Sequence, residues 1–374
     1  MTMGKHLVLV GGGHAHMVTL ANLHDFIDKG HKVTVIGPSA YHYYSGMGPG
    51  MLGKIYAPED IRFATQYVVE KQGAVFILGK VVRVDPEGKT VILESGEAVS
   101  YDVISFNTGS YVPRSIVKNG EKDIVSVKPI EKLMDAQKRI LELVPRKKIT
   151  VSIIGGGPSA AEIAGNVWRL TRNHGPNTPK IQIFAGKKFM SRVPKTIRSK
   201  VSISLKKRGI KILEKDYVKD IKTGQITLES EQRYDTDFIF LALGVKPSSI
   251  FKESRLPTGP DGGLLVNKYL QCTAYPEIFG GGDCIYFKDR PLDKVGVYAV
   301  RQNPVLYQNL MASLEEAVLQ PFDPGGDYLL IFNMGDDTGI LRKKWLVFGG
   351  RLAFLIKDHI DRKFIRKFQA IEQT

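Results

Sequence analysis

Two stretches of this chain share one local pattern, in which a short apolar run ends in three glycines and a helix-forming segment follows. The first run ends at Gly11-Gly12-Gly13 and the second at Gly155-Gly156-Gly157, 144 positions later. Glycines permit a tight turn and a close backbone approach, and the free N–H groups at the start of the next helix favour a phosphate. One such pattern alone would be weak evidence for a nucleotide site. Because it occurs twice, we predict two dinucleotide-binding units.

The composition is that of a globular protein with room for more than one domain. At 374 residues the chain holds about two domains, and its hydrophobic fraction of 43% is ordinary. We see no apolar run long enough to cross a bilayer and no signal peptide. The two cysteines, Cys272 and Cys284, offer neither a disulfide framework nor a metal-ligand cluster, so we expect no metal and a cytoplasmic location. The net charge of +15 indicates an anionic partner.

The first unit departs from the usual dinucleotide pattern at two places. Its sixth position is His16 rather than glycine, so the helix predicted over 17–28 must sit slightly further from the strand. The next strand, 32–36, ends without the acid that normally binds the ribose hydroxyls, which leaves backbone groups or Ser39 for that task. The candidate cofactor-binding residues of this turn are Gly11, Gly12, Gly13, His14, Ala15 and His16.

An aromatic and glycine-rich loop follows at 41–54. Such a loop can wrap a flat ligand, because backbone approaches closely where side chains are absent. It can equally be a surface loop whose aromatic side chains enter the core. The sequence leaves both interpretations open.

The second unit repeats the same logic with different chemistry after its second strand. Its candidate nucleotide-binding residues are Gly155, Gly157, Pro158, Ser159 and Ala160. Glu162 follows in the first turns of the helix. The strand 180–184 again ends without an acid, and Lys187 and Lys188 come shortly after it. Lysines at this place are compatible with the 2′-phosphate of NADPH, or they are simply solvated.

The two halves form an internal duplication, since each closes with an apolar strand ending in glycine. These strands end at Thr108-Gly109 and at Leu243-Gly244. We therefore predict an α/β fold with two Rossmann-like dinucleotide-binding domains, the second inserted in the first. The expected boundaries are 1–112 with 248–320 for the first domain, 113–247 for the second, and 321–374 for a C-terminal region.

A further strand leads to Gly282-Asp283, which places a carboxylate where it can accept hydrogen bonds from ligand hydroxyls. A helix is predicted from Ala299, and its positive N-terminal end can stabilise negative charge on a reduced cofactor. Tyr298 and Gln302 lie at the start of this helix.

The C-terminal stretch 341–369 is strongly basic, with nine Lys and Arg residues against two Asp. Apolar residues recur at helical spacing and predict an amphipathic helix with one apolar stripe: Leu352, Leu355, Ile356, Ile360, Phe364 and Phe368. Helices of this type lie on anionic membrane surfaces. The alternative is a helix docked on its own protein or on a dimer partner. We expect no nucleic-acid binding, because no motif for it is present.

As a set, these motifs resemble the flavoproteins that carry two dinucleotide domains, over about residues 5 to 320. The closest match is the branch of type II NADH dehydrogenases and sulfide:quinone oxidoreductases, including the NADH-dehydrogenase-like proteins sometimes fused to selenophosphate synthetase. The residues that carry it are the glycine patterns at 11–16 and 155–160, Thr108-Gly109, Gly244, Gly282-Asp283, the 299–304 segment and the basic tail. The resemblance implies FAD bound by 11–16, Gly109 and Asp283, with Ala299 at its helix start, and NADH or NADPH bound by 155–160.

The activity implied is hydride transfer from NAD(P)H to the flavin and onward to a quinone. Glu162, Gln302 and Tyr298 are the candidate catalytic residues. No Cys-x4-Cys pair exists, so electrons must leave the flavin directly. We expect a peripheral location on the inner face of the cell membrane, and a homodimer is compatible with the sequence. Three alternatives stay open: a sulfide:quinone reductase using Cys272 and Cys284, a reductase of a soluble partner, and a redox sensor without turnover.

Overall fold

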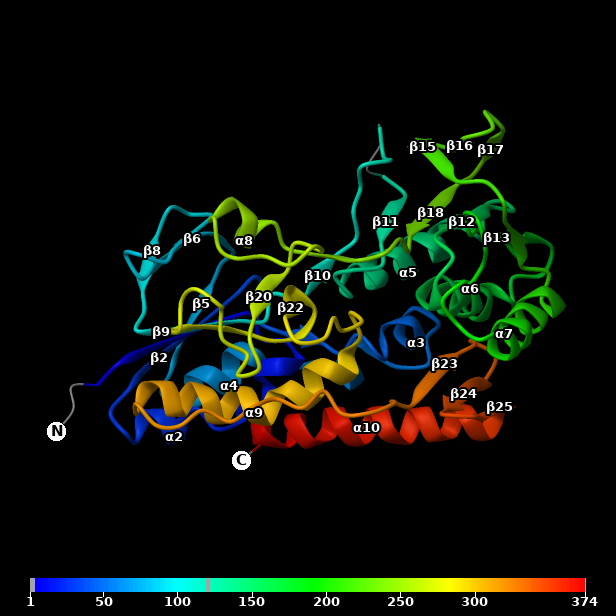
Figure 1. The fold of residues 1–374 in the computed structure, drawn as a ribbon. Coiled ribbons are helices and arrows are strands. Elements are labelled where there is room, and N and C mark those ends of the chain that lie inside the picture. The colour runs from blue at the N-terminus through cyan, green and yellow to red at the C-terminus, as the bar shows by residue number, and fades with distance from the viewer. Residues whose placement is uncertain (1–3, 119–121, 374) are drawn as a thin grey trace.

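The computed structural model describes residues 4–118 and 122–373, and its framework is a pair of five-stranded parallel sheets (Figure 1). The first sheet has the strand order β21-β9-β1-β2-β5. Its strands are β1 (His6–Val10), β2 (Lys32–Gly37), β5 (Val75–Leu78), β9 (Val103–Phe106) and β21 (Ile278–Gly280). Their side chains are mostly buried, because helices cover both faces of a parallel sheet.

The second sheet repeats this arrangement with the order β11-β18-β12-β13-β14. Its strands are β11 (Ile124–Ser126), β12 (Thr150–Ile154), β13 (Lys180–Phe184), β14 (Lys211–Leu213) and β18 (Phe238–Leu241). All five lie in the chain between β9 and β21, so one sheet is inserted into the other. The predicted fold class is confirmed.

Each half also carries an antiparallel meander before its last central strand. The first consists of β6 (Val81–Asp85), β7 (Thr90–Leu93) and β8 (Ala98–Ser100), and the second of β15 (Val218–Lys222), β16 (Gln225–Leu228) and β17 (Arg233–Asp235). The two linkers between the halves pair with each other as β10 (Ser110–Tyr111) and β19 (Lys246–Pro247). The chain passes from one half to the other after β9 and again after β18, and this pairing holds the two linkers side by side.

The helix predicted over 17–28 is wrong, because it is broken into α1 (Met17–Ala21) and α2 (His24–Ile27). Gln72 causes the break. Its side-chain oxygen accepts the Leu23 N–H at 2.8 Å and its side-chain nitrogen donates to the Leu20 carbonyl at 2.7 Å. An inserted amide of this kind replaces the helical hydrogen bonds locally.

The chain contains eight further α-helices within the described residues. They are α3 (Gly48–Leu52), α4 (Thr65–Lys71), α5 (Lys132–Leu143), α6 (Pro158–Thr171), α7 (Lys195–Lys207), α8 (Ile250–Glu253), α9 (Gly296–Leu314) and α10 (Arg351–Gln373). Helix α9 starts three residues before the predicted position at Ala299. Its second turn, rather than its first, therefore carries Gln302.

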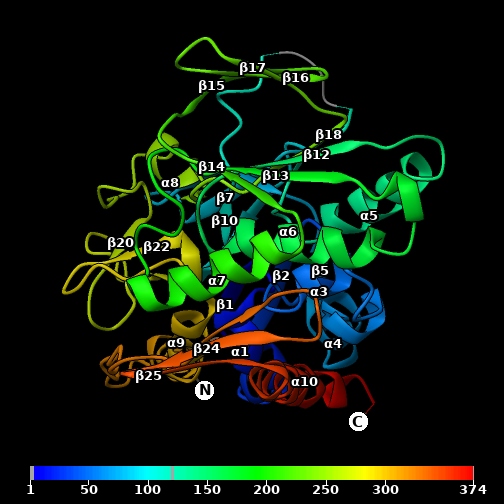
Figure 2. The same cartoon turned by 90° about the vertical axis from the view of Figure 1, so that its right-hand side faces the viewer.

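The C-terminal region forms a small antiparallel sheet and a long helix that lies beneath both halves (Figures 1 and 2). The sheet consists of β23 (Leu330–Asn333), β24 (Gly339–Lys343) and β25 (Leu346–Gly350). In the described residues, no helix is both long and apolar enough to cross a bilayer.

The single apolar stripe predicted for the tail helix is wrong, because the helix has two apolar sides. Phe364 and Phe368 pack inward, where their rings contact each other and Phe368 contacts Phe63. Leu352 and Leu355 lie on the outside and are exposed. The tail is thus docked on its own protein, and a separate apolar side faces out.

Candidate functional site

The first glycine turn is closed by a residue that the sequence analysis missed, Asn107, directly after β9. Gly11 has a φ of +92°, and a Cβ on Gly11 or Gly13 would overlap Asn107. The Asn107 side chain accepts the Ala15 N–H at 3.2 Å and donates to the Gly281 carbonyl at 2.7 Å. One amide therefore connects the turn after β1 to the segment after β21. A polar residue at the carboxyl end of a central strand was the only signal for it.

His16 fills the place of the usual third glycine and is fully buried. Its ring nitrogens are bonded to the Gly11 carbonyl at 2.7 Å and to the Ser105 hydroxyl at 2.8 Å. Burial lowers the pKa of His16 to about 4, so the ring is neutral. The imidazole separates the helix from the strand and connects the glycine turn to β9 through these two hydrogen bonds.

Two buried polar atoms beside this turn have no partner among the described residues, His14 Nε2 and Thr65 Oγ1. A Cβ on Gly12 would come 2.8 Å from Thr65 Cγ2, which places Thr65 at the turn. His14 stacks on Phe364 of α10, with ring centroids 5.7 Å apart. Unpartnered buried polar atoms next to a side-chain-free turn suit a polar ligand group. The residues present therefore fit the pyrophosphate of FAD.

Asp283 lies at the junction of the two halves. Its Oδ2 accepts the Ser110 hydroxyl at 2.7 Å and the Lys128 ammonium at 2.8 Å. Burial alone would raise the pKa of Asp283, but Lys128 and the hydrogen bonds from Lys128 and Ser110 outweigh it and lower the pKa. The carboxylate is thus ionised. Its other oxygen has no partner among the described residues and can accept a ligand hydroxyl.

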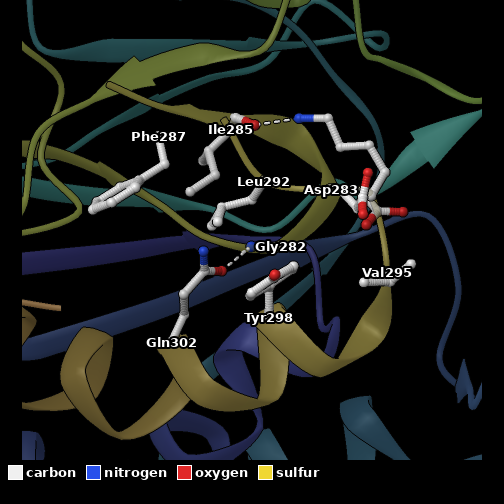
Figure 3. Close-up of a pocket in the computed structure, with 10 residues that line it drawn as sticks. Gly282, Asp283, Ile285, Phe287, Leu292, Val295, Tyr298 and Gln302 are labelled. Atoms are coloured by element: carbon white, nitrogen blue, oxygen red, sulfur yellow. Dashed lines mark hydrogen bonds between the residues drawn. The ribbon is translucent and has the colours of Figure 1, made fainter. Parts of the chain in front are cut away.

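Figure 3 shows the small pocket beside Asp283, where Tyr298 and Gln302 rise from α9. Gln302 is 1% exposed, and its side-chain oxygen accepts the Gly282 N–H at 2.7 Å. This bond fixes the backbone at the cofactor turn, and the catalytic role of Gln302 stays a prediction. Tyr298 lines the pocket and contacts Tyr328 edge-on.

The remaining predicted residues of the first unit surround the same turn. Ala299 is buried, and a Cβ on Gly282 would lie 3.5 Å from it. Ser39 accepts the Tyr41 N–H at 3.2 Å and so shapes the turn after β2. Thr108 is exposed, and Gly109, with a φ of +66°, faces open space.

The second glycine turn is open. Gly155, with a φ of +139°, lies against the Ala242 backbone, whereas a Cβ on Gly157 or Gly244 would meet nothing within 4 Å. Pro158 and Ser159 are exposed and Ala160 is buried. In the first turn of α6, Pro158 has no N–H and the Ala160 and Ala161 N–H groups donate to the Gly157 carbonyl, which leaves the N–H of the exposed Ser159 for a nucleotide.

Glu162 does not point to the second turn but toward the C-terminal region. Its Oε1 accepts the Asn333 N–H at 2.8 Å. Nearby, the Lys357 ammonium of α10 donates to the Gly46 carbonyl at 2.8 Å and to Asp361 at 2.6 Å. The Tyr44 hydroxyl donates to the other oxygen of Asp361 at 3.0 Å. We call Glu162, Lys357, Asp361 and Tyr44 the junction cluster, because it joins α6, the 41–54 loop and α10.

The junction cluster combines buried groups of opposite charge. Burial raises the pKa of Glu162, and Lys357 and the Asn333 N–H oppose this only in part. Burial disfavours the Lys357 ammonium, but Asp361 and Glu162 outweigh that effect and raise the pKa of Lys357. Glu162 is thus an acid that retains its proton to higher pH than usual, near the Lys357 ammonium. The i,i+4 pair Lys357–Asp361 inside an apolar helix face was its sequence signal.

The two interpretations of the 41–54 loop are resolved by its packing. Its glycines allow α3 to lie close to the second half, since a Cβ on Gly48 would come 3.0 Å from Ile130 and one on Gly53 2.5 Å from Asn166. Tyr43 and Met47 are buried in the core. Most of the loop therefore packs against the rest of the protein, and the Tyr44 hydroxyl and the Gly46 carbonyl make polar contacts with α10.

Both cysteines are buried and free. Cys284 donates from Sγ to the Phe106 carbonyl at 3.3 Å and to the Gly281 carbonyl at 3.2 Å. Burial raises the pKa of both the Cys272 and the Cys284 thiol. Neither has the exposed, lowered-pKa environment of a reactive thiolate.

Comparisons with known proteins agree with this geometry. The family described as pyridine nucleotide-disulphide oxidoreductase matches residues 5–316. Ferroptosis suppressor protein 1 of Taeniopygia guttata is 26% identical over 314 residues, covering 81% of this chain and 80% of the relative. Type II NADH:quinone oxidoreductase of Staphylococcus saprophyticus is 22% identical over 405 residues, covering 98% and 96%. The structure of NDH2 from Plasmodium falciparum in complex with NADH has a TM-score of 0.82 at 14% identity, covering 98% and 96%.

Proposed function

Because the chain belongs to the pyridine nucleotide-disulphide oxidoreductase family, we propose that it is an FAD-dependent enzyme that passes electrons from NADH or NADPH to a quinone. One observation carries this proposal: the chain has one closed and one open glycine turn, and a buried acid and an ammonium lie near each other on α6 and α10. The closed turn suits a resident cofactor and the open turn suits a co-substrate that enters and leaves. The chain has no cysteine pair to relay electrons between them.

We assign residues 1–112 and 248–320 to FAD, 113–247 to NAD(P)H and 321–374 to the acceptor side. The residues that would hold FAD are Gly11 to His16, Ser39, Thr108, Gly109, Gly282, Asp283 and Ala299. Those for the nicotinamide cofactor are Gly155, Gly157 to Ala160, and Gly244. When bound, FAD takes electrons from the reduced nicotinamide and passes them to the acceptor.

Lys128 and Asp283 form an ion pair where the two halves meet. Asp283 keeps one carboxylate oxygen for a ligand hydroxyl, while its other oxygen fixes the Lys128 ammonium. A cation held at this place favours negative charge on a ligand nearby. We propose that Lys128 stabilises the reduced cofactor in this way.

The junction cluster is our candidate for the acceptor site. Reducing a quinone to a quinol takes two electrons and two protons, whereas NAD(P)H brings two electrons and one proton. The second proton comes from solvent and needs a protein group to deliver it. Glu162 is suited to this role, because its raised pKa lets it hold a proton and the neighbouring Lys357 can stabilise the carboxylate left behind.

The outer side of the C-terminal region is our candidate for membrane docking. Trp345, at the turn between β24 and β25, is 88% exposed and directly follows Lys343 and Lys344. Leu352 and Leu355 of α10 are 63% and 51% exposed. Tryptophan and lysine at an apolar edge are typical of a protein that lies on an anionic bilayer. The exposed patch and the junction cluster share α10, so the proposed acceptor site lies on the helix that would face the bilayer.

Vesicle co-sedimentation tests the membrane proposal. Binding to vesicles of anionic phospholipid, weakened by salt, is expected for the native chain and should drop in a Trp345→Ala, Leu352→Ala variant. Vesicles of neutral phospholipid should bind less in both cases. Equal sedimentation of the two proteins would contradict docking, and concentration-dependent dimers lost in the variant would assign the patch to a second copy.

The activity is tested by anaerobic stopped-flow mixing of the purified flavoprotein with NADH, NADPH or sulfide. We expect a reduced nicotinamide to bleach the oxidised-flavin band quickly and a soluble quinone to restore it. Bleaching by sulfide alone would indicate a reaction that depends on the cysteines and not on a reduced nicotinamide. A flavin that none of the three reduces would refute the proposed enzyme.

A further inference from the structure

The loop that follows β13, residues 185–190, lies against the open glycine turn. A Cβ on Gly156 would come 2.5 Å from the Ala185 carbonyl, and the Met190 N–H donates to the Gly156 carbonyl at 2.6 Å. Both ends of the loop are thus fixed to the turn. In a Rossmann unit the residues after the second strand face the ribose of the bound nucleotide.

The charges of this loop are positive and unpaired. Lys187 and Lys188 are exposed, and no described carboxylate forms an ion pair with either. Arg192, also exposed, extends the positive charge. Two acids follow the adjacent strand β14, and both are engaged: Glu214 accepts the Phe189 N–H at 2.7 Å, and Asp216 accepts the Ser230 hydroxyl. The two lysines are therefore free for an anionic ligand.

The first unit provides an internal comparison at the same position. There β2 ends at Gly37, and the segment that follows, Pro38-Ser39-Ala40, carries no charge. FAD has an unmodified adenosine ribose, so no charge is needed. A pair of lysines at the equivalent place in the second unit indicates that its nucleotide differs from FAD by an anionic group on that ribose.

We infer that Lys187 and Lys188 bind the 2′-phosphate of the electron donor, so that the enzyme prefers NADPH to NADH. This rests on the proposed function, because it names the donor of the same reaction. Ammonium groups on flexible stems are suited to a phosphate as point charges. Tyr217, whose ring lies over Gly186 and is half exposed, gives the adenine a surface beside the lysines.

Calorimetric titration of the oxidised holoenzyme with 2′,5′-ADP and with 5′-ADP tests the inference without any redox step. We expect 2′,5′-ADP to bind about tenfold or more tightly, as is typical of charge-assisted hydrogen bonds. The Lys187→Ala, Lys188→Ala double variant should lose this difference. A matched control is Lys206→Ala, Lys207→Ala, because these exposed lysines lie on the far end of α7. The control should keep the wild-type preference.

A second arm uses stopped-flow reduction of the flavin. NADPH should be the faster donor at low concentration, and Lys187→Glu with Lys188→Glu should reverse the preference toward NADH. Tighter binding of 5′-ADP than of 2′,5′-ADP would overturn the inference and assign the ribose hydroxyls to Glu214. A preference for 2′,5′-ADP that survives the double variant would also overturn it.

The two proposals fail in different ways. If NADH and NADPH reduce the flavin equally and the two ADP probes bind equally, the donor inference fails and the proposed function stands. If neither donor reduces the flavin but 2′,5′-ADP still binds through the lysines, the proposed function fails and the phosphate site stands.

Discussion

The two glycine turns have nearly the same backbone shape but different surroundings. Gly13 has φ −73° and ψ 179°, and Gly157 has φ −92° and ψ −179°. After Gly13 come three buried residues, 14–16, whereas Gly157 is followed by the exposed Pro158 and Ser159. The two duplicated units thus share the backbone conformation of the turn, and the neighbouring side chains determine whether the turn is buried or accessible. This is the difference expected between the site of a resident cofactor and that of a passing co-substrate.

The duplicated strands also meet at their ends. Lys128 comes two residues after β11 and Asp283 comes three residues after β21, the equivalent edge strands of the two sheets, and the pair forms an ion pair at 2.8 Å. The linkers after β9 and β18 pair as β10 and β19. Equivalent strand ends therefore face each other, and the polar groups that a shared ligand needs come from both halves.

The largest expected effect comes from replacing the third glycine of each turn by alanine, which adds one methyl group at equivalent positions. Gly13→Ala overlaps Asn107, so we expect a loss of about 1–3 kcal/mol in the free energy of unfolding and protein that purifies without flavin. The methyl group added by Gly157→Ala meets open space, so this variant should keep its flavin and its stability. Its affinity for NAD(P)H should fall, because the methyl group occupies space at the nucleotide turn. Flavin absorbance per chain, thermal unfolding and nucleotide titration measure the contrast. Equal flavin content in the two variants would break the comparison.

Glu162 belongs to α6, the helix that follows the open turn, but its side chain contacts the C-terminal region at Asn333. A substitution at Glu162 therefore tests the comparison further. Glu162→Gln keeps the shape and removes the transferable proton. We expect flavin reduction by NAD(P)H to change little and flavin reoxidation by quinone to slow about a hundredfold, a typical contribution of a general acid. Stopped-flow records both half-reactions separately. Asp237→Asn is a control, since Asp237 pairs with Lys147 on the same half away from the junction. An equal loss in both half-reactions would contradict the assignment.

The sealed turn should also be the acid-sensitive one. Burial lowers the pKa of His14 to about 3 and the pKa of His16 to about 4, below the ordinary value of 6.5. From about pH 6.5 downward the unfolded chain then binds more protons than the folded one, so acid lowers the free energy of unfolding. The slope is up to about 1.4 kcal/mol per pH unit for each buried histidine.

Thermal unfolding followed by flavin fluorescence, from about pH 7 to about pH 5, measures this slope. His16→Gln should reduce the slope, and His359→Gln, on the exposed side of α10, should leave it unchanged. If both variants have the wild-type slope, His16 does not contribute to the acid sensitivity.

The sequence predicted the features that depend on local pattern. The two strand–glycine–helix units, the apolar strands that close each half and the insertion of one half in the other all follow from residues close together in the chain. The broken helix is the exception, and its cause is not local. A single helix over 17–28 was expected because its own residues allow it, and only the approach of Gln72 from α4 interrupts it.

The contacts that complete the site could not be predicted, because they join segments far apart in the chain. Asn107 contacts Gly281, and Lys357 reaches Gly46, 311 positions away. The tail shows the same limit. Its apolar residues have helical spacing all along, and that spacing does not tell which side of the helix the rest of the protein covers.

The smallest expected effect concerns the thiol next to the cofactor carboxylate. Cys284 follows Asp283, and its Sγ donates to two carbonyls in the core at 3.2 and 3.3 Å. A serine hydroxyl can donate to the same acceptors. Cys284→Ser should therefore keep NAD(P)H-dependent quinone reduction within about twofold, since a buried thiol of raised pKa is a structural donor and not a nucleophile. Abolished turnover with flavin still bound would instead make the closed turn a thiol site. The open turn would then no longer be the entrance for electrons, because a sulfur donor would reach the flavin through the sealed half.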